Sequence, residues 1–103
     1  MVRENDIQKS LLEALWYNKI HAWRNNTGAY KTERGGFVRF GTKGSGDIFA
    51  IQPITGKFIS IEVKQPKQYP SPEQKEWMQK VNDNGGIAFV ARSIDDLKSH
   101  NII

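Results

Sequence analysis

The chain contains no cysteine, and only two of its 103 residues are histidine. Without cysteine there is no disulfide, no thiolate zinc site and no cysteine nucleophile, a pattern compatible with an intracellular setting. The histidines, His21 and His100, are too far apart in sequence to form a paired metal-binding motif, so we assign both a structural role. Other residue types must therefore supply the chemistry of any active site.

Long apolar runs are also missing. The N-terminus is charged from its third residue, and no uninterrupted apolar stretch approaches the ~20 residues that span a membrane. We therefore expect neither a signal peptide nor a transmembrane helix, and a cytoplasmic protein. At this length, residues 1–103 are expected to form a single domain with one core.

Positive charge is in excess. Fifteen Lys and Arg stand against eleven Asp and Glu, which gives a formal net charge of +4. Such a balance favours a polyanionic partner, nucleic acid being the commonest.

Helices are predicted from periodicity and capping signals. From Glu4 to about Asn18, apolar residues recur at intervals of three and four, the spacing of an amphipathic helix. Ser71, Pro72 and Gln74 provide an N-cap, a proline in the first turn and a capping box, so a second helix is predicted over residues 72–84. A short last helix is predicted over residues 93–99.

Strands are predicted where β-branched and aromatic residues cluster between turn residues, at 20–25, 36–41, 47–52, 57–64 and 87–92. Pro53 and Gly56 favour a tight connection, so 47–52 and 57–64 should form an antiparallel hairpin. A mixed central sheet flanked by helices would bury these elements, and the predicted fold class is therefore α/β. The glycine-rich segment 32–46 is expected to be the most mobile part.

The hairpin carries charges that a purely structural hairpin does not need. Alternation along the second strand places Glu62 and Lys64 on one face, and pairing of Gln52 with Lys57 would place Asp47 opposite Glu62. Facing carboxylates repel each other unless a cation lies between them, and their hard oxygen ligands suit Mg²⁺ or Mn²⁺. Either this is a metal site served by Lys64, or Glu62 and Lys64 simply face solvent while Asp47 closes a turn.

Two further polar residues prolong apolar helical stripes, because positions seven apart nearly coincide on a helix. Glu4 lies in line with Leu11, and Gln74 lies in line with Val81. Both positions suit a helix end that opens on a polar site. The alternative for Gln74 is its capping box, which accounts for it fully, and for Glu4 the favourable interaction of a carboxylate with the helix dipole.

Basic and aromatic residues alternate between the first strand and Asp47. They are Lys31, Arg34, Arg39 and Lys43, with Tyr30, Phe37 and Phe40 between them. We predict that the cations contact DNA phosphates; the alternative is a solvated loop whose aromatics belong to the core, and we place Phe40 in that core. Arg24 either contacts a phosphate or pairs with an acidic side chain, and Lys64, Lys67 and Lys75 could extend the same surface.

Several motifs occur in an order that resembles one known family. They are Glu4 with Gln8, RNNTG from Arg24, GTKGSGD ending at Asp47, IEVK ending at Lys64, and SPEQKEW with Gln74. From Glu4 to about Val90 the chain resembles a stand-alone VRR-NUC domain, the virus-type replication-repair nuclease, within the PD-(D/E)xK superfamily. One departure is Gly46, where the superfamily name has proline.

The resemblance implies a restriction-endonuclease-like core and hydrolysis of DNA phosphodiesters with one or two Mg²⁺ or Mn²⁺ ions and no organic cofactor. Asp47, Glu62 and the backbone carbonyl of Val63 would bind metal, and Lys64 would be the catalytic lysine. Glu4 would act through a metal-bound water or orient a ligand. Gln74 would support Lys64 or the attacking water.

Compact relatives resemble Holliday-junction resolvases. They act as homodimers in phages and bacteria, which implies a homodimer acting on branched DNA in replication, recombination or repair, in a bacterial or phage-infected cell. Trp16, Tyr17 and Trp23 are candidates for the dimer face, although core packing explains them equally well. Two rival functions are a non-catalytic nucleic-acid-binding module and a small subunit that regulates a larger machine.

Overall fold

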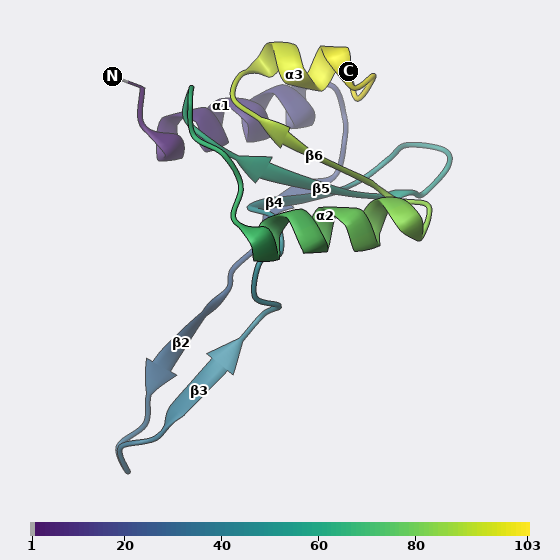
Figure 1. The fold of residues 1–103 in the computed structure, drawn as a ribbon. Coiled ribbons are helices and arrows are strands. Elements are labelled where there is room, and N and C mark those ends of the chain that lie inside the picture. Colours follow the sequence, from purple (N-terminus) through teal and green to yellow (C-terminus); the bar gives the residue numbers. More distant parts are fainter. Residues whose placement is uncertain (1) are drawn as a thin grey trace.

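The computed structural model describes residues 2–103 (Figure 1). The helices are α1 (Glu4–Tyr17), α2 (Pro72–Asp83) and α3 (Ile94–Ser99). The strands are β1 (Ala22–Arg24), β2 (Gly28–Lys31), β3 (Phe37–Phe40), β4 (Ile48–Ile51), β5 (Phe58–Val63) and β6 (Ile87–Ala91). The predicted helices and strands are confirmed to within about two residues at their ends, while β2 is a strand that the sequence pattern did not predict.

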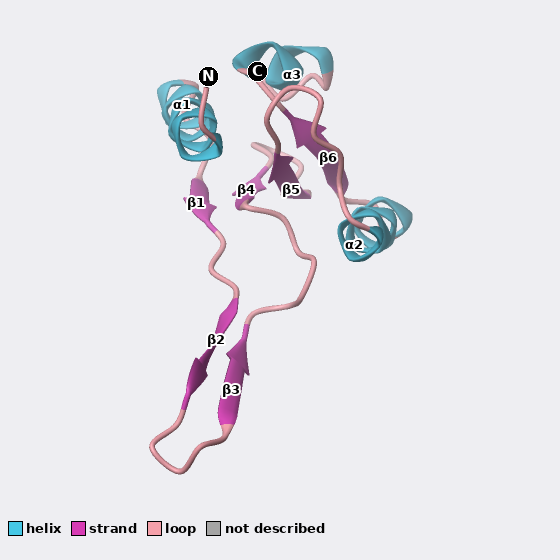
Figure 2. Cartoon of the chain, turned by 60° about the vertical axis from the view of Figure 1, so that its left-hand side comes forward, coloured by secondary structure: helices cyan, strands magenta, loops and turns pink. Residues whose placement is uncertain are grey.

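The main sheet has the strand order β1-β4-β5-β6. β1, β4 and β5 are antiparallel, and β6 runs parallel to β5, so the sheet is mixed as predicted. The predicted register of the hairpin is confirmed, because Ile48 pairs with Ile61 and Ile51 pairs with Phe58. Figures 1 and 2 show α1 and α3 covering one face of this sheet and α2 covering the other.

The two faces of β5 are both buried, but they differ in chemistry. Ile59, Ile61 and Val63 point into the hydrophobic core together with Leu11 and Leu15 of α1. Ser60 and Glu62 point to the opposite face, where α2 lies, and Glu62 is only 2% exposed. The interpretation of Glu62 as a solvent-facing residue is therefore wrong, because α2 covers the face that an isolated hairpin would leave open.

β2 and β3 form a separate antiparallel hairpin, here called the arm, which extends away from the body (Figures 1 and 2). Every residue of its two strands is exposed. The placement of Phe40 in the core is therefore wrong, since its side chain is 43% exposed. Phe40 packs instead across its strand partner Gly28, where an added Cβ would lie 2.9 Å from the Phe40 ring.

The aromatic residues at the end of α1 lie outside the core. Trp16 is 54% exposed and Tyr17 is 89% exposed, so core packing does not explain them. Trp16 sits at the rim, where its indole N–H donates to the Ala22 carbonyl at 2.9 Å. Within residues 2–103, no helix is long and apolar enough to cross a bilayer.

Candidate active site

The start of β4 and the end of β5 bring Asp47 and Glu62 together. The backbone N–H of Asp47 donates to the Ile61 carbonyl at 2.8 Å, next to the last strand pair, Ile48 with Ile61. Its carboxylate oxygen Oδ2 accepts from the Val63 N–H at 2.7 Å. The Asp47 carboxylate is thus held against the end of β5, beside the residues predicted to bind metal.

The loop before Asp47 is shaped by Asn25, to which the sequence pattern assigned no role. Its Nδ2 donates to Ser45 Oγ and to the Gly46 carbonyl, both at 2.8 Å, and its backbone N–H donates to the Asp47 carbonyl at 2.9 Å. Asn25 belongs to the RNNTG motif, and this motif is the sequence signal that could have identified it as a site residue. It is positioned to orient the segment that carries Asp47.

Gly46 packs directly against β5. An added Cβ would overlap Ser60 Oγ and would lie 3.0 Å from the Ile61 carbonyl oxygen. Ser60 Oγ in turn accepts from Trp77 Nε1 of α2 at 2.8 Å, so it cannot move away freely. These contacts explain why glycine rather than proline precedes Asp47 in this chain.

Glu62 is held by Gln74 of α2. Gln74 Nε2 donates to Glu62 Oε1 at 2.8 Å, while Gln74 Oε1 accepts from the Ser71 backbone N–H at 2.8 Å. The capping box therefore sets the orientation of the amide, leaving its N–H group to point at Glu62. The interpretation that capping fully accounts for Gln74 is incomplete, because the same side chain serves both the helix end and the site.

The second oxygen of the Glu62 carboxylate lacks a hydrogen-bond donor among residues 2–103. Oε2 is buried and, in the ionised carboxylate, accepts no hydrogen bond from the residues that the structure describes. A buried charged oxygen without a partner is costly, and native proteins retain such groups chiefly where a ligand or ion completes them. An oxygen of this kind beside the Asp47 carboxylate fits Mg²⁺ or Mn²⁺ well.

The protein side chains can supply only some of the ligands that such an ion needs. Within residues 2–103, no group of three or more His, Cys, Asp or Glu side chains is close enough to hold a metal. Mg²⁺ commonly binds through one or two carboxylates and fills its remaining positions with water and substrate oxygens. Asp47, Glu62 Oε2 and the Val63 carbonyl are the groups at this end of β5 that would hold it.

Burial and charge shift the protonation of Glu62. Burial is the largest cause, followed by the charge of Asp47 and a side-chain hydrogen bond with Asp47, and together they raise the pKa of Glu62 from 4.5 to about 8. Lys64 opposes this shift, and Glu4 adds to it. Near neutral pH the carboxyl is therefore protonated without metal, and its proton can bridge to Asp47.

We expect the stability of the metal-free protein to fall as pH rises from about 5 to 9. Folded Glu62 keeps its proton up to about pH 8, whereas the unfolded chain releases it near pH 4.5, so this contribution is lost as pH rises through the folded pKa. Thermal unfolding at several pH values, compared with the Glu62→Gln variant, measures it. A wild-type curve parallel to that of the variant would contradict the shift.

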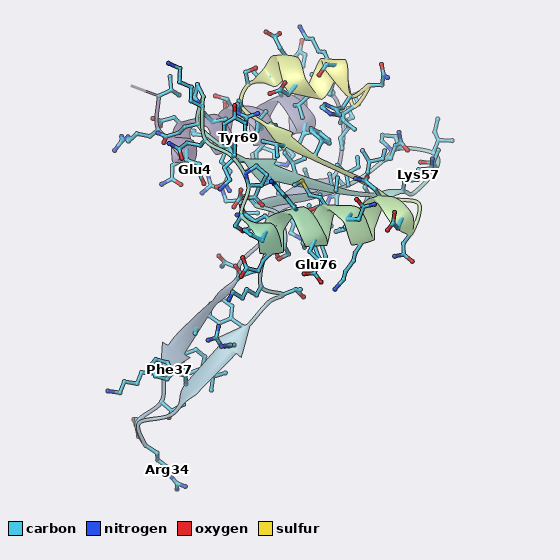
Figure 3. All side chains as sticks on the ribbon, viewed as in Figure 1. Glu4, Arg34, Phe37, Lys57, Tyr69 and Glu76 are labelled. Carbon is cyan, nitrogen blue, oxygen red and sulfur yellow. The ribbon has the colours of Figure 1, made fainter. Side chains whose placement is uncertain are left out.

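Glu4 and Lys64 lie within electrostatic range of Glu62, because both contribute to its pKa. Glu4 is exposed at the start of α1 (Figure 3), a position that suits contact through water. Lys64 is half-buried, and its backbone N–H donates to the Ala91 carbonyl of β6 at 3.1 Å. Both are therefore close enough to influence the charge of Glu62.

The predicted DNA-contact residues are distributed over the arm, the edge strand and a loop of the body. Lys31 and Arg39 lie on the arm and Arg34 at its tip (Figure 3). Lys67 lies in the loop between β5 and α2, and Arg24 lies on the edge strand β1. No acidic side chain among residues 2–103 forms an ion pair with Arg24, so the proposed acidic pairing is wrong.

Comparison with known proteins places these features in context. The model of the VRR-NUC domain family matches residues 3–95. A solved structure described as a VRR_NUC domain protein has a TM-score of 0.63 and 20% sequence identity, covering 100% of this chain and 89% of the other. No curated protein matches the sequence. These findings confirm the resemblance inferred from the motifs and the predicted α/β fold of the restriction-endonuclease type.

Proposed function

Because the chain belongs to the VRR-NUC domain family, a family of nucleases, we propose that it is a divalent-metal-dependent DNA endonuclease with its active site at Asp47 and Glu62. One observation carries the proposal: the buried, unpartnered Oε2 of Glu62 beside a second carboxylate. A purely structural hairpin gains nothing from this pair. A metal-binding active site requires such a pair.

In this proposal a bound Mg²⁺ or Mn²⁺ supplies charge neutralisation and activates the nucleophile for phosphodiester hydrolysis. The Lys64 ammonium stabilises negative charge developing on the phosphate oxygens or orients the attacking water. Gln74 holds Glu62 so that Oε2 faces the site, and Glu4 orients water at its exposed edge. Asn25 keeps Asp47 in register with β5.

The proposed substrate is branched DNA, and the proposed active form is a homodimer. One chain presents a single pair of site carboxylates, so cutting both strands of a junction requires two sites related by a two-fold axis. The exposed Trp16 and Tyr17, together with Trp23 on the edge strand β1, provide an apolar surface for such a contact. Lys43, in the loop before β4, and Lys67, in the loop between β5 and α2, suit contact with the DNA backbone.

The test compares the wild type with Asp47→Asn, which keeps an acceptor for the Val63 N–H. Both are incubated with end-labelled four-way junction, flap, single-stranded and linear duplex DNA, in Mg²⁺, Mn²⁺ or EDTA. We expect metal-dependent cleavage by the wild type alone, strongest on branched DNA. Gel retardation without cleavage by either protein would instead indicate a non-catalytic nucleic-acid-binding module.

A further inference from the structure

The arm sorts its side chains onto two chemically different faces. Strand partners share a face of a hairpin, so Lys31 with Phe37 and Ala29 with Arg39 form one face. The other face carries Tyr30, Val38 and Phe40. Residues 27–43 hold four cations and one acidic residue, Glu33. The first face and the tip, where Arg34 lies, are therefore basic.

The arm gains little stability from packing. A two-stranded hairpin in water is marginally stable at best, and this one contributes no side chain to the hydrophobic core. Its turn is closed locally, by the Thr32 N–H donating to the Gly36 carbonyl at 2.8 Å. An exposed, charged extension that adds nothing to the core suggests a binding role.

The arm's base is anchored at the active site. Asn25, just before β2, is bonded to Ser45, Gly46 and Asp47, just after β3. At the same place Gly41 adopts φ +74°, and an added Cβ there would lie 2.8 Å from the Asn26 carbonyl oxygen. Both ends of the arm therefore leave the body beside the metal-binding carboxylates.

A cleft of about 270 Å³ lies at this base, with Arg39 and Lys43 in its wall. The glycine residues Gly28, Gly41 and Gly44 form other parts of the wall, so a phosphate can approach the backbone closely there. Lys43 Nζ lies 3.8 Å from Glu73 Oε1, with both side chains exposed. Arg39, the other cation in the wall of the cleft, forms no ion pair with any of residues 2–103.

We propose that the arm is a duplex-binding element that holds one flank of the DNA substrate by its sugar-phosphate backbone, through Lys31, Arg34 and Arg39. This inference rests on the proposed nuclease function and adds where the substrate must extend. The cross-strand pair that contains Lys31 lies two residues along the hairpin from the pair that contains Arg39, which is a separation of about 7 Å. That spacing equals about two base-pair steps, because the phosphates of one DNA strand follow each other about every 3.4 Å along the helix axis.

The length of the arm sets the length of flank that it can reach. From the pair Gly28–Phe40 to Thr32, where the turn that carries Arg34 begins, there are four residues, which span roughly 13 Å in extended conformation. B-DNA rises about 3.4 Å per base pair, so the strands of the arm reach roughly 4 base pairs from its base. We expect cleavage to require about this much duplex on one side of the cut, and not on the other.

The experiment uses substrates whose two flanks are shortened separately, one base pair at a time. The wild type is compared with the triple variant Lys31→Ala, Arg34→Ala, Arg39→Ala. The matched control removes the same charge from the body with Lys9→Ala, Lys57→Ala and Lys98→Ala, all exposed residues, of which Figure 3 labels Lys57. Thermal unfolding confirms folding, and we expect the arm variant to keep its Tm because the arm lies outside the core.

For the wild type, kcat/KM should rise as one flank grows to about 4 base pairs and then level off. The arm variant should lose this gain yet match the wild type on substrates with that flank removed. In gel-shift assays, the slope of log affinity against log salt should fall by about 2.7 for three lost phosphate contacts.

Equal losses in the arm and control variants, or an unchanged salt slope, would overturn the proposed role of the arm. Because binding is measured without cleavage, absence of cutting on every substrate would contradict the nuclease proposal alone. The two proposals can therefore fail separately.

Discussion

Replacing Glu62 with glutamine should abolish metal-dependent cleavage and at the same time stabilise the metal-free protein. The amide keeps an oxygen to accept from Gln74 Nε2, and it places an N–H group where Oε2 is now unpartnered. That N–H can donate to Asp47, as the proton of the protonated acid does. The uncharged amide is a poor metal ligand, so the contribution of the ion to transition-state stabilisation is lost.

The expected loss of activity is at least about a thousandfold, since a metal ion contributes several kcal/mol to such a transition state. The expected gain in stability is about 1–3 kcal/mol, the cost of a buried polar group without a partner. This gain should grow as pH rises from about 5 and reach its full size above about pH 8, where wild-type Glu62 has lost its proton.

Single-turnover cleavage and thermal unfolding at pH 6 and pH 9 measure the two effects of Glu62→Gln. Glu76→Gln is the matched control, because Glu76 lies on the exposed surface of α2 in an ion pair with Lys80. It should leave both quantities unchanged. A Glu62→Gln variant that cuts at the normal rate, or that is less stable at pH 9, would contradict the assignment of Glu62.

Replacing Lys64 with alanine should retain metal binding but slow cleavage by about a hundredfold to a thousandfold, the usual cost of losing one transition-state charge or donor. Its backbone N–H would still bond to the Ala91 carbonyl, so the end of β5 should keep its position. Removing the positive charge also removes an interaction that lowers the pKa of Glu62. Metal affinity should therefore weaken modestly near neutral pH and recover at higher pH.

Calorimetric titration with Mn²⁺ and cleavage under saturating DNA distinguish these effects of Lys64→Ala. Lys67→Ala is a suitable control, because Lys67 lies nearby in the exposed loop before α2 and should affect DNA affinity rather than turnover. If Lys64→Ala lost metal binding at every pH, Lys64 would be supporting the metal site rather than the reaction. If it cut DNA normally, the catalytic role would be wrong.

Several features of the site could be predicted from the sequence because they depend only on residues that are close together in the chain. Asp47 could be placed beside the end of β5 because the turn at Pro53 and Gly56 sets the pairing of the two strands that it joins, although its N–H bonds to Ile61 rather than to Glu62. Gln74 could be placed in a capping box because Ser71 lies three residues before it. The order of the motifs along the chain was sufficient to identify the family.

Other features depended on packing between distant segments. The sequence did not reveal that Gln74 reaches Glu62, because that contact requires α2 to lie across the sheet. The raised pKa of Glu62 has the same origin, since burial under α2 is its largest cause. The exposure of Phe40 was misjudged because an aromatic residue in a strand is usually buried, and here the strand leaves the body in the arm.

By itself, therefore, the sequence determined the helices, the hairpin register and the residue types of the site, because each follows from local periodicity or from a tight turn. Only the tertiary structure decided that one oxygen of Glu62 is buried without a partner, that Asn25 joins the base of the arm to Asp47, and that the basic arm projects from the site. These features depend on how separate segments exclude water from one another, which no local pattern records.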